Sequence, residues 1–133
     1  MRFMLLALLL SLPLRAEELP AEAKQALDAY VKALEARNAD EMWEMYGERL
    51  RGKVVQRIGP QADRTKWLTA EADRLIGKGG EVEVKEVILG ATVSIAHVKF
   101  PGGPVVSLRF GREDGVMKVI DADRVSNPGN EIS

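Results

Sequence analysis

The stretch Gly79-Gly-Glu-Val-Glu-Val-Lys85 divides the sequence into two halves with different hydrophobic patterns. From Glu81 to Lys85, charged residues and valines alternate strictly, which is typical of a β-strand with one buried face. Before the two glycines, apolar residues recur every three or four positions, as they do in amphipathic helices. Helices followed by strands predict an α+β fold in which N-terminal helices pack on a mainly antiparallel sheet.

Three helical segments are expected before the two glycines. Pro20 is tolerated in the first turn of the first helix, and Gly77 suits the left-handed position after the last one. Asp40 and Asp63 are suitable N-caps for the second and third helices. Gly47 is expected to interrupt the second segment. The three segments span residues 20–36, 40–58 and 63–76.

Four strands are expected in the second half, at residues 81–89, 92–100, 105–110 and 116–122. Gly90, a Pro-Gly-Gly-Pro loop at 101–104 and the turn Glu113-Asp-Gly115 separate them. The alternation slips at residues 87–89, which predicts a β-bulge in the first strand. Because the connections are short, the strands are expected to form a meander.

The first sixteen residues have the pattern of a secretory signal. Arg2 supplies a positive charge, residues 3–12 are almost entirely apolar, and Ala16 is a small residue at the expected cleavage site. The apolar run is shorter than the roughly 20 residues that span a bilayer. We therefore predict a signal peptide at 1–16, a domain at 17–124 and a flexible tail at 125–133, with a secreted or periplasmic location. An uncleaved signal would instead tether the protein to a membrane.

Composition excludes several classes of function. The sequence has no cysteine, which rules out disulfides and thiolate metal sites. Its formal net charge is −1, and every acidic residue lies at Glu17 or later, so loss of the signal makes the protein more acidic. A basic footprint for nucleic acid is therefore not expected. No cofactor and no metal site is predicted.

Two segments resemble the nuclear transport factor 2-like superfamily, which includes the SnoaL-like proteins. One is Ala26-Leu-Asp-Ala-Tyr-Val-Lys-Ala-Leu-Glu-Ala-Arg-Asn-Ala-Asp-Glu-Met-Trp43, which is similar to the family's long first helix, polar turn and second helix. The other is Gly111-Arg-Glu-Asp-Gly-Val-Met-Lys-Val-Ile-Asp121, which resembles the family's last hairpin. Met117 stands where that hairpin usually has tryptophan.

The resemblance covers residues 20–123 and implies an exported, bacterial-type member of the superfamily. It implies a curved sheet wrapped against helices, forming a cone with an apolar pocket, often in a homodimer. Members include isomerases, dehydratases, binders of small molecules, transport adaptors and exported domains. The alternative fold is a cystatin-like helix on an antiparallel sheet, which the three helical segments disfavour.

Aromatic residues and the single histidine are the candidates to line such a pocket. His97 is a weak catalytic candidate, since a histidine in the pocket could act as a general acid or base. If the second strand begins near Thr92, His97 shares a face with Val93 and Ile95. Its alternative role is that of an ordinary strand histidine, and the alternative for the aromatic residues is the core. The pocket candidates are Tyr30, Trp43, Tyr46, Trp67, His97 and Phe110.

Charged residues provide further candidates, each with a surface alternative. A basic cluster on the second helical segment could bind an anion, and Glu44 and Glu48 lie close enough to weaken its charge. Arg109 would need an anionic partner if it faced inward. Asp28, Asp121 and Asp123 are carboxylates that could act as bases. The basic cluster comprises Arg49, Arg51, Lys53 and Arg57.

The sequence leaves two main hypotheses for function. The first is a non-enzymatic exported domain that binds a small apolar ligand or an envelope protein. The second is an acid/base isomerase or dehydratase that acts in the cone with His97 or an aspartate. A binder needs an apolar lining with a few hydrogen-bond donors, whereas an enzyme needs a titratable group with a shifted pKa inside the pocket.

Overall fold

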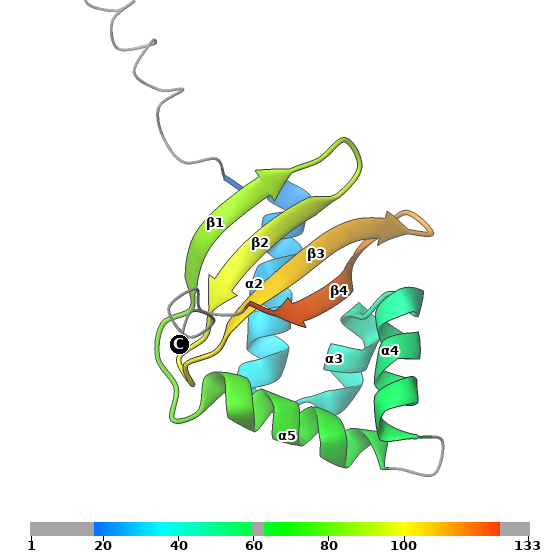
Figure 1. The fold of residues 1–133 in the computed structure, drawn as a ribbon, viewed down its shortest axis with the longest axis vertical. Coiled ribbons are helices and arrows are strands. Elements are labelled where there is room, and N and C mark those ends of the chain that lie inside the picture. The colour runs from blue at the N-terminus through cyan, green and yellow to red at the C-terminus, as the bar shows by residue number, and fades with distance from the viewer. Residues whose placement is uncertain (1–17, 60–62, 126–133) are drawn as a thin grey trace, which may run out of the picture.

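The computed structural model describes residues 18–59 and 63–125, which form four helices and one sheet (Figure 1). The predicted signal peptide, and the predicted tail from residue 126 onward, lie outside these described residues. Within the described ranges, no helix has the length and apolarity that crossing a membrane would require.

The helices follow the predicted order, but the second segment is divided into two separate helices. Gly47 ends the extended link between them, and its backbone N–H donates to the carbonyl oxygen of Val119 at 2.8 Å. This contact places Tyr46 and Gly47 alongside the last strand, where no helix can continue. The four helices are α2 (Ala21–Glu35), α3 (Ala39–Met45), α4 (Glu48–Ile58) and α5 (Arg64–Ile76).

The helix caps correct one prediction and confirm another. Asn38, and not Asp40, caps α3, since its side chain accepts a hydrogen bond from the Glu41 N–H at 3.1 Å. Ala39 is buried, so the helix must begin one residue after Asn38 to place it against the core. Asp63 caps α5 as expected, by accepting from the Lys66 N–H at 3.1 Å.

The four strands form an antiparallel meander in the order β1-β2-β3-β4, as predicted. A register shift in β1 lies between Val84 and Glu86, slightly earlier than the expected bulge. A second irregularity lies in β4, where Ile120 is an extra residue between the pairs Arg109–Asp121 and Phe110–Val119. The strands are β1 (Glu83–Leu89), β2 (Ser94–Lys99), β3 (Val105–Glu113) and β4 (Val116–Arg124).

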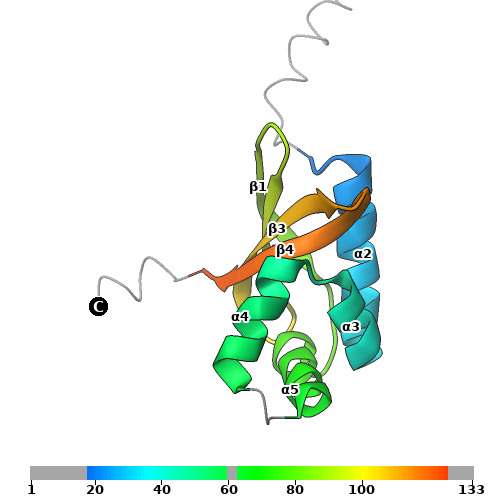
Figure 2. The same ribbon diagram turned by 90° about the vertical axis from the view of Figure 1, so that its right-hand side faces the viewer.

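The core lies between one face of the sheet and the helices (Figures 1 and 2). Helix α2 crosses behind the sheet, and α4 lies beside β4 at the sheet edge. The sheet contributes alternate residues to the core, among them Ala96, Val98, Leu108 and Phe110. This arrangement leaves the other face of the sheet uncovered by any described helix.

Candidate ligand-binding site

A cavity of about 650 Å³ opens between α4, α5 and the adjoining parts of β3 and β4. Its inner wall consists of buried apolar side chains, whereas most of its charged lining residues are exposed and therefore mark its mouth. Its size is within the range of small-molecule sites, and its lining combines an apolar inner wall with a larger number of polar and charged residues. The lining residues are Tyr30, Tyr46, Leu50, Lys53, Val54, Gln56, Arg57, Trp67, Glu71, Arg74, Leu75, Val106, Ala122, Asp123 and Arg124.

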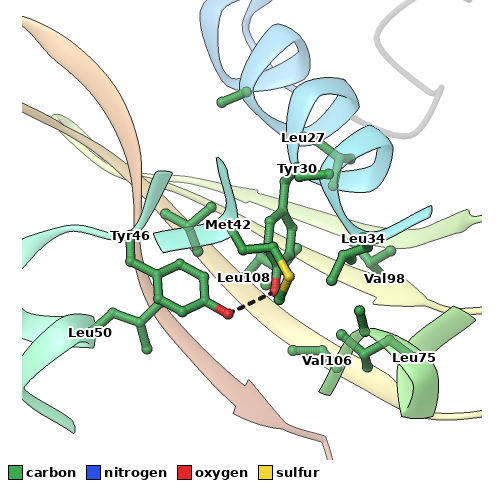
Figure 3. Close-up of a cluster of buried hydrophobic side chains, with 14 of the residues drawn as sticks. Leu27, Tyr30, Leu34, Met42, Tyr46, Leu50, Leu75, Val98, Val106 and Leu108 are labelled. Atoms are coloured by element: carbon green, nitrogen blue, oxygen red, sulfur yellow. Dashed lines mark hydrogen bonds between the residues drawn. The ribbon is translucent and has the colours of Figure 1, made fainter. Parts of the chain in front are cut away.

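Two tyrosines that line this cavity bring their hydroxyls together among buried side chains (Figure 3). Tyr30 projects from α2 and Tyr46 from the link between α3 and α4, and their hydroxyl oxygens lie 3.3 Å apart. Two hydroxyls carry two hydrogens, but one mutual hydrogen bond uses only one of them. Neither hydroxyl has a further hydrogen-bond partner among the described residues. The pair therefore retains one O–H group that can donate a hydrogen bond to a ligand oxygen.

Burial keeps both tyrosines uncharged. It raises the pKa of Tyr46 to about 12, and it raises the pKa of Tyr30 well above its usual value. A phenol with such a pKa stays protonated at neutral pH and acts as a hydrogen-bond donor. The pair can orient a ligand, but neither member is suited to accept a proton from it.

Lys53 links α4 to β4 at the edge of the cavity. Its Nζ lies 2.6 Å from Oδ1 of Asp121 and 3.1 Å from Oδ1 of Asp123. Burial acts to raise the pKa of Asp121, but the hydrogen bond and charge of Lys53 outweigh it, so this pKa lies below its usual value. The hydrogen bond to Asp121 in turn raises the pKa of Lys53. The pair is therefore charged at neutral pH and holds one wall of the cavity in place.

Three arginines stand at the mouth of the cavity, and one of them has a carboxylate partner. Arg74 forms two hydrogen bonds with Glu71 on the same helix, at 2.9 and 3.0 Å. Arg57, in the last turn of α4, and Arg124, the last residue of β4, are exposed. Neither forms an ion pair within the described part of the chain.

The cavity brings together half of the predicted pocket residues: Tyr30, Tyr46 and Trp67 line it. Phe110 lies in the core with 1% of its surface exposed. Trp43 packs beside Tyr46, and the guanidinium groups of Arg64 and Arg51 lie 4.3 and 5.3 Å from its ring centre. Trp43 therefore has a structural environment away from the cavity lining.

His97 lies on the opposite face of the sheet from the helices, outside the cavity. It shares this face with Ile95, as expected, but Ala96 and Val98 are the residues of β2 that point to the core. Its Nδ1 lies 3.2 Å from Oε1 of Glu86 on the neighbouring strand. The structure thus agrees with the alternative role of His97 as an ordinary strand histidine and not with its candidacy for the pocket, because the other face of β2 packs under the helices.

The remaining charged candidates are mostly at the surface or paired. Asp28 and Arg109 are exposed, in agreement with their surface alternatives. In the basic cluster, Arg49 Nε lies 3.6 Å from Oδ2 of Asp121, and Arg51 donates to the carbonyl oxygen of Trp43 at 3.1 Å. Within the described ranges, no group of three or more histidine, aspartate or glutamate side chains has an arrangement that could hold a metal ion.

Sequence reasoning did not identify the residues that complete the cavity. Leu50, Val106, Glu71, Arg74 and Arg124 line the cavity, but none of them was among the candidates from the sequence. Arg124 points to the cavity side because Ile120 is inserted in β4 and reverses the alternation after it. The slip in register is the feature that a strict alternation cannot predict.

A solved structure has a similar fold. The crystal structure of a SnoaL-like protein of unknown function from Burkholderia thailandensis E264 matches 83% of this chain and 100% of its own, with a TM-score of 0.53 and 18% identity. This chain has the SnoaL-like fold. The fold that the two sequence segments predicted is thereby confirmed. No protein-family model matches the sequence, and a comparison with curated proteins finds no match.

Proposed function

We propose that this protein is an exported SnoaL-like domain that binds a small apolar ligand in the cavity between α4 and α5, without transforming it. The observation that carries the proposal is the cavity itself, whose inner wall combines buried Leu50, Val54, Leu75 and Val106 with the tyrosine pair. Apolar walls supply affinity, and one free O–H donor supplies orientation. Its export rests on the pattern of residues 1–16.

The lining favours binding over acid/base catalysis. A general acid or base works best when its pKa lies near the operating pH. Tyr30 and Tyr46 are far from that condition, because burial raises the pKa of each. Glu71 and Asp123 are engaged by Arg74 and by Lys53. The isomerase or dehydratase alternative therefore has less support than a binding role.

A dye-binding experiment tests the proposal. N-phenyl-1-naphthylamine is a neutral, apolar fluorophore, and we expect saturable binding with one dye per chain. Ala122→Phe adds a ring where Ala122 lines the cavity and should abolish binding, whereas Ala29→Phe adds the same ring at an exposed position of α2 and should not. Circular dichroism establishes that both variants fold. Absent binding, or binding that is unchanged in Ala122→Phe, would refute the proposal.

A protein partner is the second candidate, and the edge strand β1 favours it. Val84, Ile88 and Leu89 of this strand expose 43%, 44% and 45% of their surface. Edge strands also offer unpaired backbone groups to a neighbouring chain. Since Ile88 lies on the face opposite the helices, Ile88→Lys should lower the mass measured by light scattering if the chain forms a homodimer there. A monomer at every concentration would contradict self-association.

A further inference from the structure

We infer that the ligand is an amphipathic carboxylate, whose charged group lies at the mouth of the cavity with Arg57 and Arg124 and whose apolar body lies along the inner wall. This inference rests on the proposed binding function and names the chemical class of the ligand. It follows from the charges at the mouth, from the placement of the two arginines and from the apolar depth of the cavity.

The charges that line the cavity do not balance. Four basic and two acidic side chains line it. Lys53 is engaged by Asp121 and Asp123, and Arg74 is engaged by Glu71. These internal pairs leave the guanidinium groups of Arg57 and Arg124 without a carboxylate among the described residues. Among the residues that the structure describes, the excess charge at the mouth is therefore positive.

The C-terminal end of α4 at the mouth reduces this positive charge without cancelling it. Arg57 lies in the last turn of α4, where a basic residue also complements the roughly half negative charge of the helix C-terminus. That role does not account for Arg124, which ends a strand. Because Ile120 is an extra residue in β4, the alternation places Arg124 opposite Val106 and on the cavity side of the sheet. Two elements distant in the sequence thus each contribute one guanidinium to the same mouth.

The chemistry of the mouth and that of the wall select different parts of one ligand. A guanidinium presents its N–H donors in a planar fork that matches a carboxylate. The inner wall provides Leu50, Val54, Leu75 and Val106, all buried, against which an aliphatic or aromatic body can pack. A neutral ligand would use only the wall, and a cationic ligand would be repelled at the mouth. An organic anion with an apolar body satisfies both regions.

Competition against N-phenyl-1-naphthylamine tests this inference with two probes of the same chain length, decanoate and 1-decanol. The readout is the ratio of the decanol to the decanoate concentration at half displacement, at one fixed ionic strength. We expect decanoate to compete at roughly two- to thirtyfold lower concentration, the range for two exposed ion pairs. Arg57→Gln and Arg124→Gln should each lower the ratio, and the double variant should bring it close to one.

Arg109→Gln is the matched control, since it removes the same charge from an exposed residue on the opposite face of the sheet. This variant should give the same ratio of decanol to decanoate concentration at half displacement as the unmodified protein. If decanoate and decanol displace the dye equally, or if the double variant keeps the preference, the carboxylate inference is wrong while the binding function stands. If the dye itself does not bind, the proposed function fails, and this inference fails with it.

Discussion

Removing either partner of the Lys53–Asp121 pair should destabilise the protein, but by unequal amounts. The Asp121 side chain is 10% exposed, whereas the Lys53 side chain is 41% exposed. In Lys53→Met, the buried carboxylate keeps only the Ala122 N–H at 3.0 Å and Arg49 at 3.6 Å. In Asp121→Asn, the lysine can turn to water and to Asp123. The lysine substitution should therefore be the more harmful of the two.

The burial of each partner determines how much each substitution lowers the free energy of unfolding. Breaking a fully buried pair costs about 3–5 kcal/mol, and an exposed pair contributes about 0–1 kcal/mol. Since Asp121 is buried but Arg49 remains near it, we expect Lys53→Met to lower the free energy of unfolding by about 2 kcal/mol. For Asp121→Asn we expect about 1 kcal/mol, because Lys53 stays solvated. The double variant should cost less than the sum, as the buried charge is then absent.

Urea unfolding at pH 7, followed by circular dichroism, measures all three variants. Lys85→Met is a matched control, because Lys85 and its partner Glu83 are both exposed, and its effect should stay within about 0.5 kcal/mol. Equal costs for the two single variants, or costs that add in the double variant, would refute the argument from unequal burial. Lys53→Met should also weaken dye binding, since Lys53 helps to hold the α4 wall against β4.

Three further predictions concern pH, packing and the tyrosine pair. Lys53 holds the pKa of Asp121 below its usual value. The stability that this pair contributes is therefore fully present above about pH 4, the pKa of an unfolded aspartate, and is lost as the pH falls through the lower pKa of the folded state. The urea concentration at the unfolding midpoint should decline over that range, and it should decline less in Asp121→Asn. Gly102→Ala should lower the free energy of unfolding in urea by about 2 kcal/mol, since a Cβ there would overlap the carbonyl oxygens of the last turn of α5. Gly52→Ala in α4 places its Cβ where it meets no atom, and it should raise the free energy of unfolding by about 0.5–1 kcal/mol. Tyr46→Phe leaves the Tyr30 hydroxyl without its partner and should lower the melting temperature, while replacing both tyrosines by phenylalanine should cost less than the two single changes together.

The order of elements was predictable because it depends on periodicity and turn chemistry, which are local. The change from a helical to an alternating pattern after Gly80 places the sheet correctly, and short turns allow only an antiparallel meander. The choice between Asn38 and Asp40 as a cap was not predictable. Both residues are good caps, and the burial of Ala39 against the core, which is a tertiary effect, decides between them.

The side to which a strand residue points was harder to predict than the strand itself. On β2, Ile95 alternates with Ala96 and Val98, so both faces carry apolar residues and the pattern does not show which one is buried. His97 was therefore a candidate for the pocket as well as for an ordinary strand position, and only the fold decides between the two. Tyr30 and Tyr46 were placed more accurately. Tyr30 lies on the apolar side of a helix whose other side is polar, and Tyr46 directly follows the bulky apolar residues of α3.

The charge at the mouth of the cavity depends on pairings that no local segment reveals. In the sequence, Glu44 and Glu48 are the nearest carboxylates to the basic cluster of α4. They suggest a solvated helix surface whose positive charge they weaken. In the fold, a carboxylate 68 residues away in the chain, that of Asp121, engages Lys53 instead. The remaining arginine of the cluster at the cavity, Arg57, is then joined by Arg124, which the extra residue in β4 turns to the same side. An anion site assembled in this way is a property of the packing of α4 on β4, so a variant that loosens this contact should weaken the preference for decanoate even when both arginines are intact.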